Sequence, residues 1–219
     1  MVNALPKYLV LLLSLSISQF SLAENTIKTL GEEWSEVSYV LKGDAQELAF
    51  ENLIKKVDQY ISHNNKDAKG WIWRGIIKSS FANVQGGLGA LSLVKAARKD
   101  LDKAISLDET SLSGSAHASL GLLYAKVPSW PFGFGNDNEA EKHLIKALEI
   151  NPDGVDTNYF YADFLFEEKR KYKKAKTYLI KAQNSIPVQI TPLADKQRQK
   201  EITTLLIKVE KKLNRRTRT

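Results

Sequence analysis

The chain has 219 residues, no cysteine and a formal net charge of +7, because 32 lysines and arginines outnumber 25 aspartates and glutamates. The lack of cysteine excludes a disulfide framework, so the packing of apolar side chains must stabilise the fold. The histidines His63, His117 and His143 are isolated in the sequence, and no Asp, Glu or His group has the spacing of metal ligands. We therefore expect no metal site, no cofactor and no enzymatic activity.

Residues 1–23 have the composition of a secretory signal peptide. Lys7 precedes an apolar run from Tyr8 to Ile17, and Ser21-Leu22-Ala23 places small residues at both positions that define a cleavage site. A membrane anchor is the alternative, but the run is shorter than the ~18 to 20 residues that a spanning helix needs. We expect an exported, periplasmic protein that starts at Glu24 and, without a cysteine there, is not a lipoprotein.

The stretch 34–65 has the pattern of two helices. Trp34 and Val37 precede a break at Gly43-Asp44, and apolar residues then recur at three- and four-residue spacing. We interpret this stretch as a degenerate opening repeat, because terminal repeats are often atypical where one face meets water.

Three segments that follow, 68–109, 114–152 and 155–187, share one pattern. In the second half of each segment, a small residue is followed four positions later by a large apolar residue and three positions after that by a second small residue. A residue at which the helix is expected to end, a breaker, comes five positions further on. These residues are Ala97, Leu101, Ala104 and Glu109; Ala140, Leu144, Ala147 and Pro152; and Ala175, Leu179, Ala182 and Pro187. The last two breakers are 35 residues apart.

The first halves of these segments carry a second motif. It reads Trp71-x2-Arg74-Gly75-x2-Lys78, then His117-x2-Leu120-Gly121-x2-Tyr124, then Asn158-x2-Tyr161-Ala162-x2-Leu165. With both motifs the chain resembles the tetratricopeptide-repeat family over residues 34 to 187. The resemblance implies an all-α fold, a right-handed α-solenoid of about three to four helix pairs. It also implies a non-enzymatic scaffold that binds a protein or peptide in the bacterial envelope.

A final helix is expected after the last repeat. Thr191-Pro192 fits an N-cap followed by proline in the first helical position. Ile202, Leu205 and Val209 then form one apolar stripe, which predicts a capping helix over 191–213 that closes the helical domain 24–214. The tail 215–219 is basic and has nothing to bury.

Insertions separate the two helices of the first two repeats. The first, 83–91, is glycine-rich but lacks the lysine and Ser/Thr of a phosphate-binding loop. The second, 128–137, holds Trp130, Phe132 and Phe134 among prolines and glycines, which indicates a shaped loop. Its aromatic side chains either fold back over the helices or contact a ligand.

Arg74 and Lys78 replace the apolar residues that the repeat pattern favours, close to Trp71 and Trp73. Such cations either reach water or find acidic partners, for which Asp156 and Asp163 are candidates, or they hold a bound carboxylate. The candidate residues for partner or ligand binding are Trp71, Trp73, Arg74, Lys78, Trp130, Phe132, Phe134, Tyr159, Asp163 and Phe166.

A narrower resemblance concerns the Pro-Trp-Pro-x-Gly-Phe-Gly type of loop and the segment from Ala194-Asp195 through Arg198 to Glu201-Ile202. Both are similar to the periplasmic component associated with some TRAP-type transporters. This resemblance implies an alternative function, a solute-binding accessory for a small anionic or apolar molecule. A long open groove favours the scaffold, whereas a closed pocket lined by Arg74, Trp130 and Phe132 favours the accessory.

Basic clusters at 169–174 and 211–218 account for much of the positive charge. Exported proteins rarely meet nucleic acid, so we expect these clusters to be solvated helix faces. Weak peripheral contact with anionic lipid headgroups is the alternative.

Overall fold

A computed structural model describes residues 26–186 and 191–216. The predicted signal peptide, 1–23, and the last residues of the basic tail lie outside the described residues. The described part of the chain is all-α, as predicted, with one isolated bridge between Ser129 and Gly135 in a loop. Among the described helices, none combines the length and apolar composition that crossing a bilayer requires.

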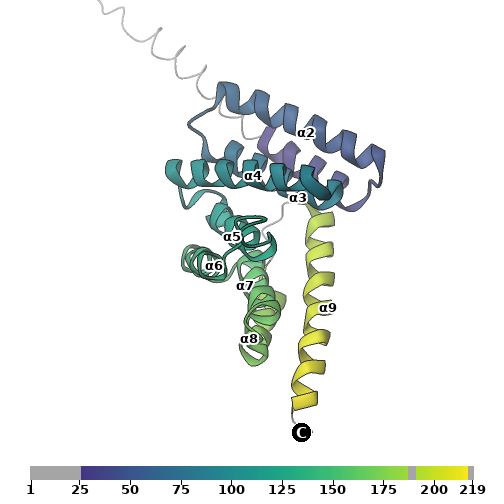
Figure 1. The fold of residues 1–219 in the computed structure, drawn as a ribbon, viewed down its shortest axis with the longest axis vertical. Coiled ribbons are helices and arrows are strands. Elements are labelled where there is room, and N and C mark those ends of the chain that lie inside the picture. The colour runs from purple at the N-terminus through teal and green to yellow at the C-terminus, as the bar shows by residue number, and fades with distance from the viewer. Residues whose placement is uncertain (1–25, 187–190, 217–219) are drawn as a thin grey trace, which may run out of the picture.

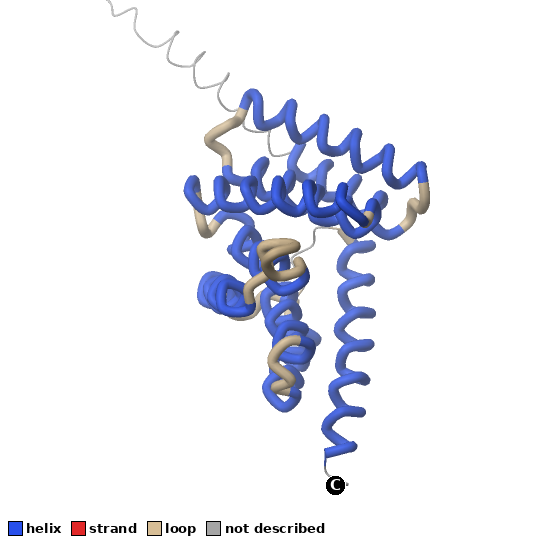
Figure 2. Tube along the Cα trace, viewed as in Figure 1, coloured by secondary structure: helices blue, strands red, loops and turns tan. Residues whose placement is uncertain are grey.

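The helices follow one another with short connections (Figure 2). A first helix covers residues 26–39. The others are α2 Asp44–His63, α3 Ala68–Gln85, α4 Gly87–Leu107, α5 Ser111–Lys126, α6 Asp137–Ile150, α7 Val155–Glu167, α8 Tyr172–Asn184 and α9 Pro192–Arg216. In Figure 1, α2, α3 and α4 lie at one end of the molecule, α5 to α8 follow, and α9 runs as one long helix to the C-terminus.

Small residues bring consecutive helices close together. A Cβ atom on Gly75 of α3 would lie 2.7 Å from Cγ of Leu101 on α4. A Cβ atom on Gly121 of α5 would lie 2.5 Å from Cγ of Leu144 on α6. Only glycine permits these approaches, so the leucines can pack directly on the facing backbone.

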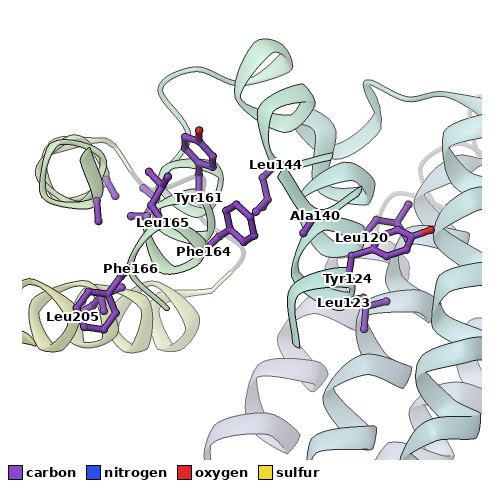
Figure 3. Packing of buried hydrophobic residues seen from close by; sticks show 14 of the residues in the cluster. Leu120, Leu123, Tyr124, Ala140, Leu144, Tyr161, Phe164, Leu165, Phe166 and Leu205 are labelled. Carbon is purple, nitrogen blue, oxygen red and sulfur yellow. The ribbon is translucent and has the colours of Figure 1, made fainter. Parts of the chain in front are cut away.

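The apolar core divides into two clusters of buried residues. The first helix, α2 and α3 form one cluster, in which the rings of Phe50 and Phe81 stack 5.5 Å apart. The larger cluster begins with residues of α3 and α4 and extends through α5, α6, α7, α8 and α9. Figure 3 shows part of it: Leu120, Leu123, Tyr124, Ala140 and Leu144 pack between α5 and α6, and Phe166 of α7 lies beside Leu205 of α9.

The start of α9 is tied to the first helix. Thr191 takes the predicted N-cap position, since its Oγ1 accepts a hydrogen bond of 3.0 Å from the backbone N–H of Ala194. The same hydroxyl donates to Oγ of Ser35, 156 residues earlier, at 2.9 Å. The helix ends at Arg216, beyond the predicted end at 213, and buries Ile202, Leu205 and Val209.

The prediction of an inserted loop at 83–91 is wrong, because these residues belong almost entirely to helices α3 and α4. Helix α3 continues to Gln85 and α4 begins at Gly87, so Gly86, with φ 64°, is the only residue between them. The extra residues lengthen these helices, to 18 and 21 residues against 13 each in α7 and α8. Gly86 and Gly87 have positive φ values of 64° and 57°, which glycine tolerates without strain. The chain can therefore reverse between α3 and α4 within one residue.

Candidate interaction site

Arg74 and Lys78 of α3 are held by carboxylates of neighbouring helices. Arg74 donates from Nη2 and Nε to the two oxygens of Asp100, at 2.6 and 3.0 Å, and from Nη1 to Asp58 at 2.6 Å. Nζ of Lys78 lies 2.8 Å from Oδ2 of Asp100, whose side chain is buried. The prediction that Asp156 or Asp163 pairs with Arg74 and Lys78 is therefore wrong.

This ion cluster has no spare charge for a ligand. Burial alone would lower the pKa of Arg74, but the hydrogen bonds to Asp100 and Asp58 raise it above its ordinary value. The guanidinium also lies over the ring of Trp71, 4.6 Å from its centroid. Since both cations already bind carboxylates of the fold, their role is structural.

The two tryptophans of α3 also contribute to the fold. Trp71 is half-buried and donates from Nε1 to the backbone carbonyl of Asn65 at 3.0 Å. Trp73 is buried, and its ring lies 5.9 Å from that of Trp34 in the first helix. Neither indole projects from the surface as a binding residue would.

The candidate residues of α7 lie beside α9. Phe166 is buried, and its ring lies 5.4 Å from that of Tyr172. Oδ2 of Asp163 pairs with Nζ of Lys126 at 2.8 Å. Tyr159 and Asp163 border an open cleft of about 230 Å³, whose other lining residues come from α9: Gln197, Lys200, Glu201, Thr204, Leu205 and Lys208.

Arg198 of α9 fixes one wall of this cleft. Its guanidinium lies 4.5 Å from the ring centroid of Tyr159 and donates from Nε to Asp156 at 2.7 Å. It also pairs with Glu201. Burial, together with the charge of Glu201, raises the pKa of Tyr159 to about 12, so its hydroxyl stays protonated at neutral pH.

The loop between α5 and α6 is compact and internally bonded. Backbone N–H groups donate from Gly133 to Ser129 at 3.2 Å, from Gly135 to Pro128 at 2.9 Å and from Asn136 to Tyr124 at 2.9 Å. A Cβ atom on Gly133 or Gly135 would collide with a backbone oxygen, that of Pro128 or of Val127 respectively. Both glycines are therefore required by the close return of the chain.

The three aromatic side chains of this loop have different surroundings. Phe134 folds back: its ring meets Tyr124 edge-on at 5.6 Å, and the guanidinium of Arg98 lies 5.2 Å from both ring centroids. Trp130 and Phe132 remain 86% and 76% exposed. Phe134 therefore folds back over the helices, which was one of the two predicted possibilities. Trp130 and Phe132 remain accessible to a partner or ligand, which was the other.

The loop is also anchored at its exit. The side chain of Asn136 accepts hydrogen bonds from the backbone N–H groups of Asn138, at 2.9 Å, and of Glu139, at 3.2 Å. This N-cap satisfies donors of the first turn of α6 and fixes where the loop ends. Trp130 and Phe132 thus project from a segment held at both ends and across its middle.

His117 of α5 and His143 of α6 form a contact that the sequence did not predict. Their Nδ1 atoms lie 2.9 Å apart, so one ring donates and the other accepts. The expectation that both were isolated is therefore wrong. The repeat register held the signal, because pairing Gly121 with Leu144 also brings the preceding turn of α5, which carries His117, beside His143.

The electrostatics of the pair keep both rings neutral. Burial lowers the pKa of His143 to about 4, and the neighbouring His117 adds to this. Burial also lowers the pKa of His117, although Nε2 lies 3.5 Å from a carboxylate oxygen of Glu109. A proton on the accepting ring would place a second N–H against the shared hydrogen bond.

The chain matches no protein-family model and no curated protein.

Proposed function

We propose that the protein is a non-enzymatic helical-repeat scaffold of the bacterial envelope that binds a protein partner, with Trp130 and Phe132 as anchors. The observation that carries this proposal is a rigid loop that presents two large aromatic side chains to solvent, at 86% and 76% exposure. Aromatic anchors of this kind dominate the binding energy of many protein interfaces.

The packing of the helices supports the repeat part of the proposal. Helices α3 and α4, α5 and α6, and α7 and α8 form close sequential pairs. The alanines of the repeat motif, among them Ala97, Ala140 and Ala175, are fully buried. These are properties of the tetratricopeptide family, which uses such arrays to hold protein or peptide partners.

The construction of the loop supports its use as a binding element. Exposed aromatic side chains are unfavourable in water, yet this loop leaves Trp130 and Phe132 exposed while it packs the partly buried Phe134 against Tyr124. Because hydrogen bonds and close-packed glycines fix the backbone, little conformational entropy is lost when a partner binds.

The alternative, a solute-binding accessory, has weaker support. It required Arg74 to line a closed pocket together with Trp130 and Phe132. Arg74 is instead engaged by Asp58 and Asp100, and the two aromatic side chains are exposed. These three residues do not enclose a small molecule, so we favour the scaffold.

Photo-crosslinking in cells of the source organism tests the proposal. A photoreactive phenylalanine analogue at position 132 should give a discrete crosslinked band, and the additional substitution Trp130→Ala should remove most of that band. The matched control carries the analogue at Leu88, which is 90% exposed at the start of α4, ten residues before Arg98, which contacts the loop. Position 88 should not give the same band.

Two results would contradict the proposal. One is an identical set of bands from positions 132 and 88, which would indicate contact by chance. The other is the absence of a protein adduct at position 132 when the chain is folded and expressed at its natural level.

A further inference from the structure

Helix α9 carries six exposed basic side chains that no described carboxylate neutralises: Lys196, Lys200, Lys208, Lys211, Lys212 and Arg215. Other cations near this helix are paired. Arg198 binds Asp156 and Glu201, and Lys176 of α8 lies 2.9 Å from Glu210. These carboxylates near α9 are thus bound to Arg198 and Lys176, which leaves the six other cations without an acidic partner among the described residues.

Five of these cations lie on one face. At about 100° per residue, Lys196, Lys200, Lys208, Lys211 and Arg215 fall within an arc of roughly 120°, opposite the buried stripe of Ile202, Leu205 and Val209. We call these five residues the cationic face. At about 1.5 Å per residue it extends over about 29 Å.

The acidic residues of α9 are kept out of this face. Asp195 lies on the packed side of the helix, close enough to Asp156 for that charge to contribute to a raised pKa of Asp195, although burial is the main cause. Glu201 is bound to Arg198, and Glu210 to Lys176. The unpaired charges of the cationic face are thus all positive, and the two glutamates at its edges, Glu201 and Glu210, are ion-paired.

We propose that the cationic face docks on the surface of a bilayer that contains anionic phospholipids. Its cations lie along one side of a single long helix, where two of them, Lys200 and Lys208, also border the open cleft beside Tyr159 and Asp163. Anionic headgroups supply the complementary charge, and each basic side chain near such a surface adds to the attraction.

The contact is peripheral. Ile207, which is 63% exposed, is the one large apolar side chain within the cationic face. One isoleucine among lysines favours electrostatic adsorption with shallow contact over the deep insertion of an amphipathic helix that has a broad apolar face. The loop with Trp130 and Phe132 lies between α5 and α6, so this surface is independent of the proposed partner site.

Vesicle co-sedimentation with the purified full chain provides the test. Binding to phosphatidylcholine vesicles measures any contribution of the apolar run at 8–17, and vesicles with added phosphatidylglycerol measure the electrostatic part. The wild-type chain should bind the anionic vesicles much more strongly at low salt, and the difference should disappear as salt rises toward 1 M.

A pair of triple variants separates the cationic face from net charge. K200E/K208E/K211E should lower partitioning onto anionic vesicles about a hundredfold. The control K95E/K99E/K103E removes three exposed, unpaired lysines from α4 with the same change in net charge, and it should retain most of the binding. Circular dichroism should show that both variants are folded.

Three outcomes would overturn the proposal. The first is equal loss of binding in both triple variants, which would mean that net charge alone attracts the chain. The second is equal binding of the wild-type chain to neutral and anionic vesicles. The third is no binding to anionic vesicles at low salt, which would leave the cationic face to an acidic protein or to solvent.

Discussion

At the residue scale, His117 and His143 make the free energy of unfolding depend on pH. In the unfolded chain a histidine has a pKa of about 6.5, whereas in the fold that of His143 is lowered to about 4. Between these values the unfolded state binds a proton that the folded state does not. Stability is therefore fully present above about pH 6.5 and falls as the pH drops toward 4.

The prediction is a lower melting temperature at pH 5 than at pH 7.5, with a smaller difference in His143→Gln. Glutamine does not titrate, so it removes the proton uptake, although losing the stacked contact with Tyr124, at 5.7 Å, should lower the melting temperature at both pH values. Calorimetry at the two pH values measures the difference. The same pH dependence in wild type and variant would show that other groups cause it.

At the element scale, Gly121 sets the distance between α5 and α6. A Cβ atom there would meet Cγ of Leu144 at 2.5 Å and the backbone nitrogen of Leu144 at 3.1 Å, so rotation of the leucine alone cannot make room. We predict that Gly121→Ala lowers the free energy of unfolding by about 1–3 kcal/mol and that Gly121→Leu lowers it further.

Urea denaturation measures this effect, with Ser119→Ala on the same helix as the control. Serine to alanine at a half-buried position adds no volume, so it should change stability by less than about 0.5 kcal/mol. A neutral Gly121→Ala would mean that α5 and α6 pack in a different register.

The sequence was sufficient for the elements that repeat. Alanine and leucine at fixed spacing predict which residues of α4, α6 and α8 are buried, because that spacing corresponds to one helix face. The prediction from sequence is wrong at 83–91. Added residues can either lengthen two helices or form a loop between them, and the apolar pattern is compatible with both arrangements. The positive φ values of Gly86 and Gly87 explain the glycines of this stretch.

The candidate site was less predictable. Asp100 lies on the repeat helix α4, and its role as partner of Arg74 and Lys78 depends on how α3 and α4 are rotated about their axes. The sequence singled out the three aromatic residues of the 128–137 loop. It could not tell that Phe134 turns inward while Trp130 and Phe132 turn outward, because loop geometry decides this.

At the scale of the whole molecule, the residues proposed for recognition differ from those that stabilise the fold. The hydrogen bond between Thr191 and Ser35 joins the start of α9 to the first helix, and the two core clusters contain most of the buried apolar residues. The exposed aromatic pair and the cationic face lie outside both clusters. Surfaces of this kind can change without loss of the fold.

Trp130 and Phe132 are proposed to serve recognition and not the fold, and thermal unfolding of two variants tests this claim. The double variant W130A/F132A should melt within about 2 °C of wild type, because both side chains are largely exposed. Phe134→Ala should melt about 5 °C lower or more, because it removes the contacts with Tyr124 and Arg98. A double variant that melts as far below wild type as Phe134→Ala would contradict the claim and assign all three aromatic residues to the fold.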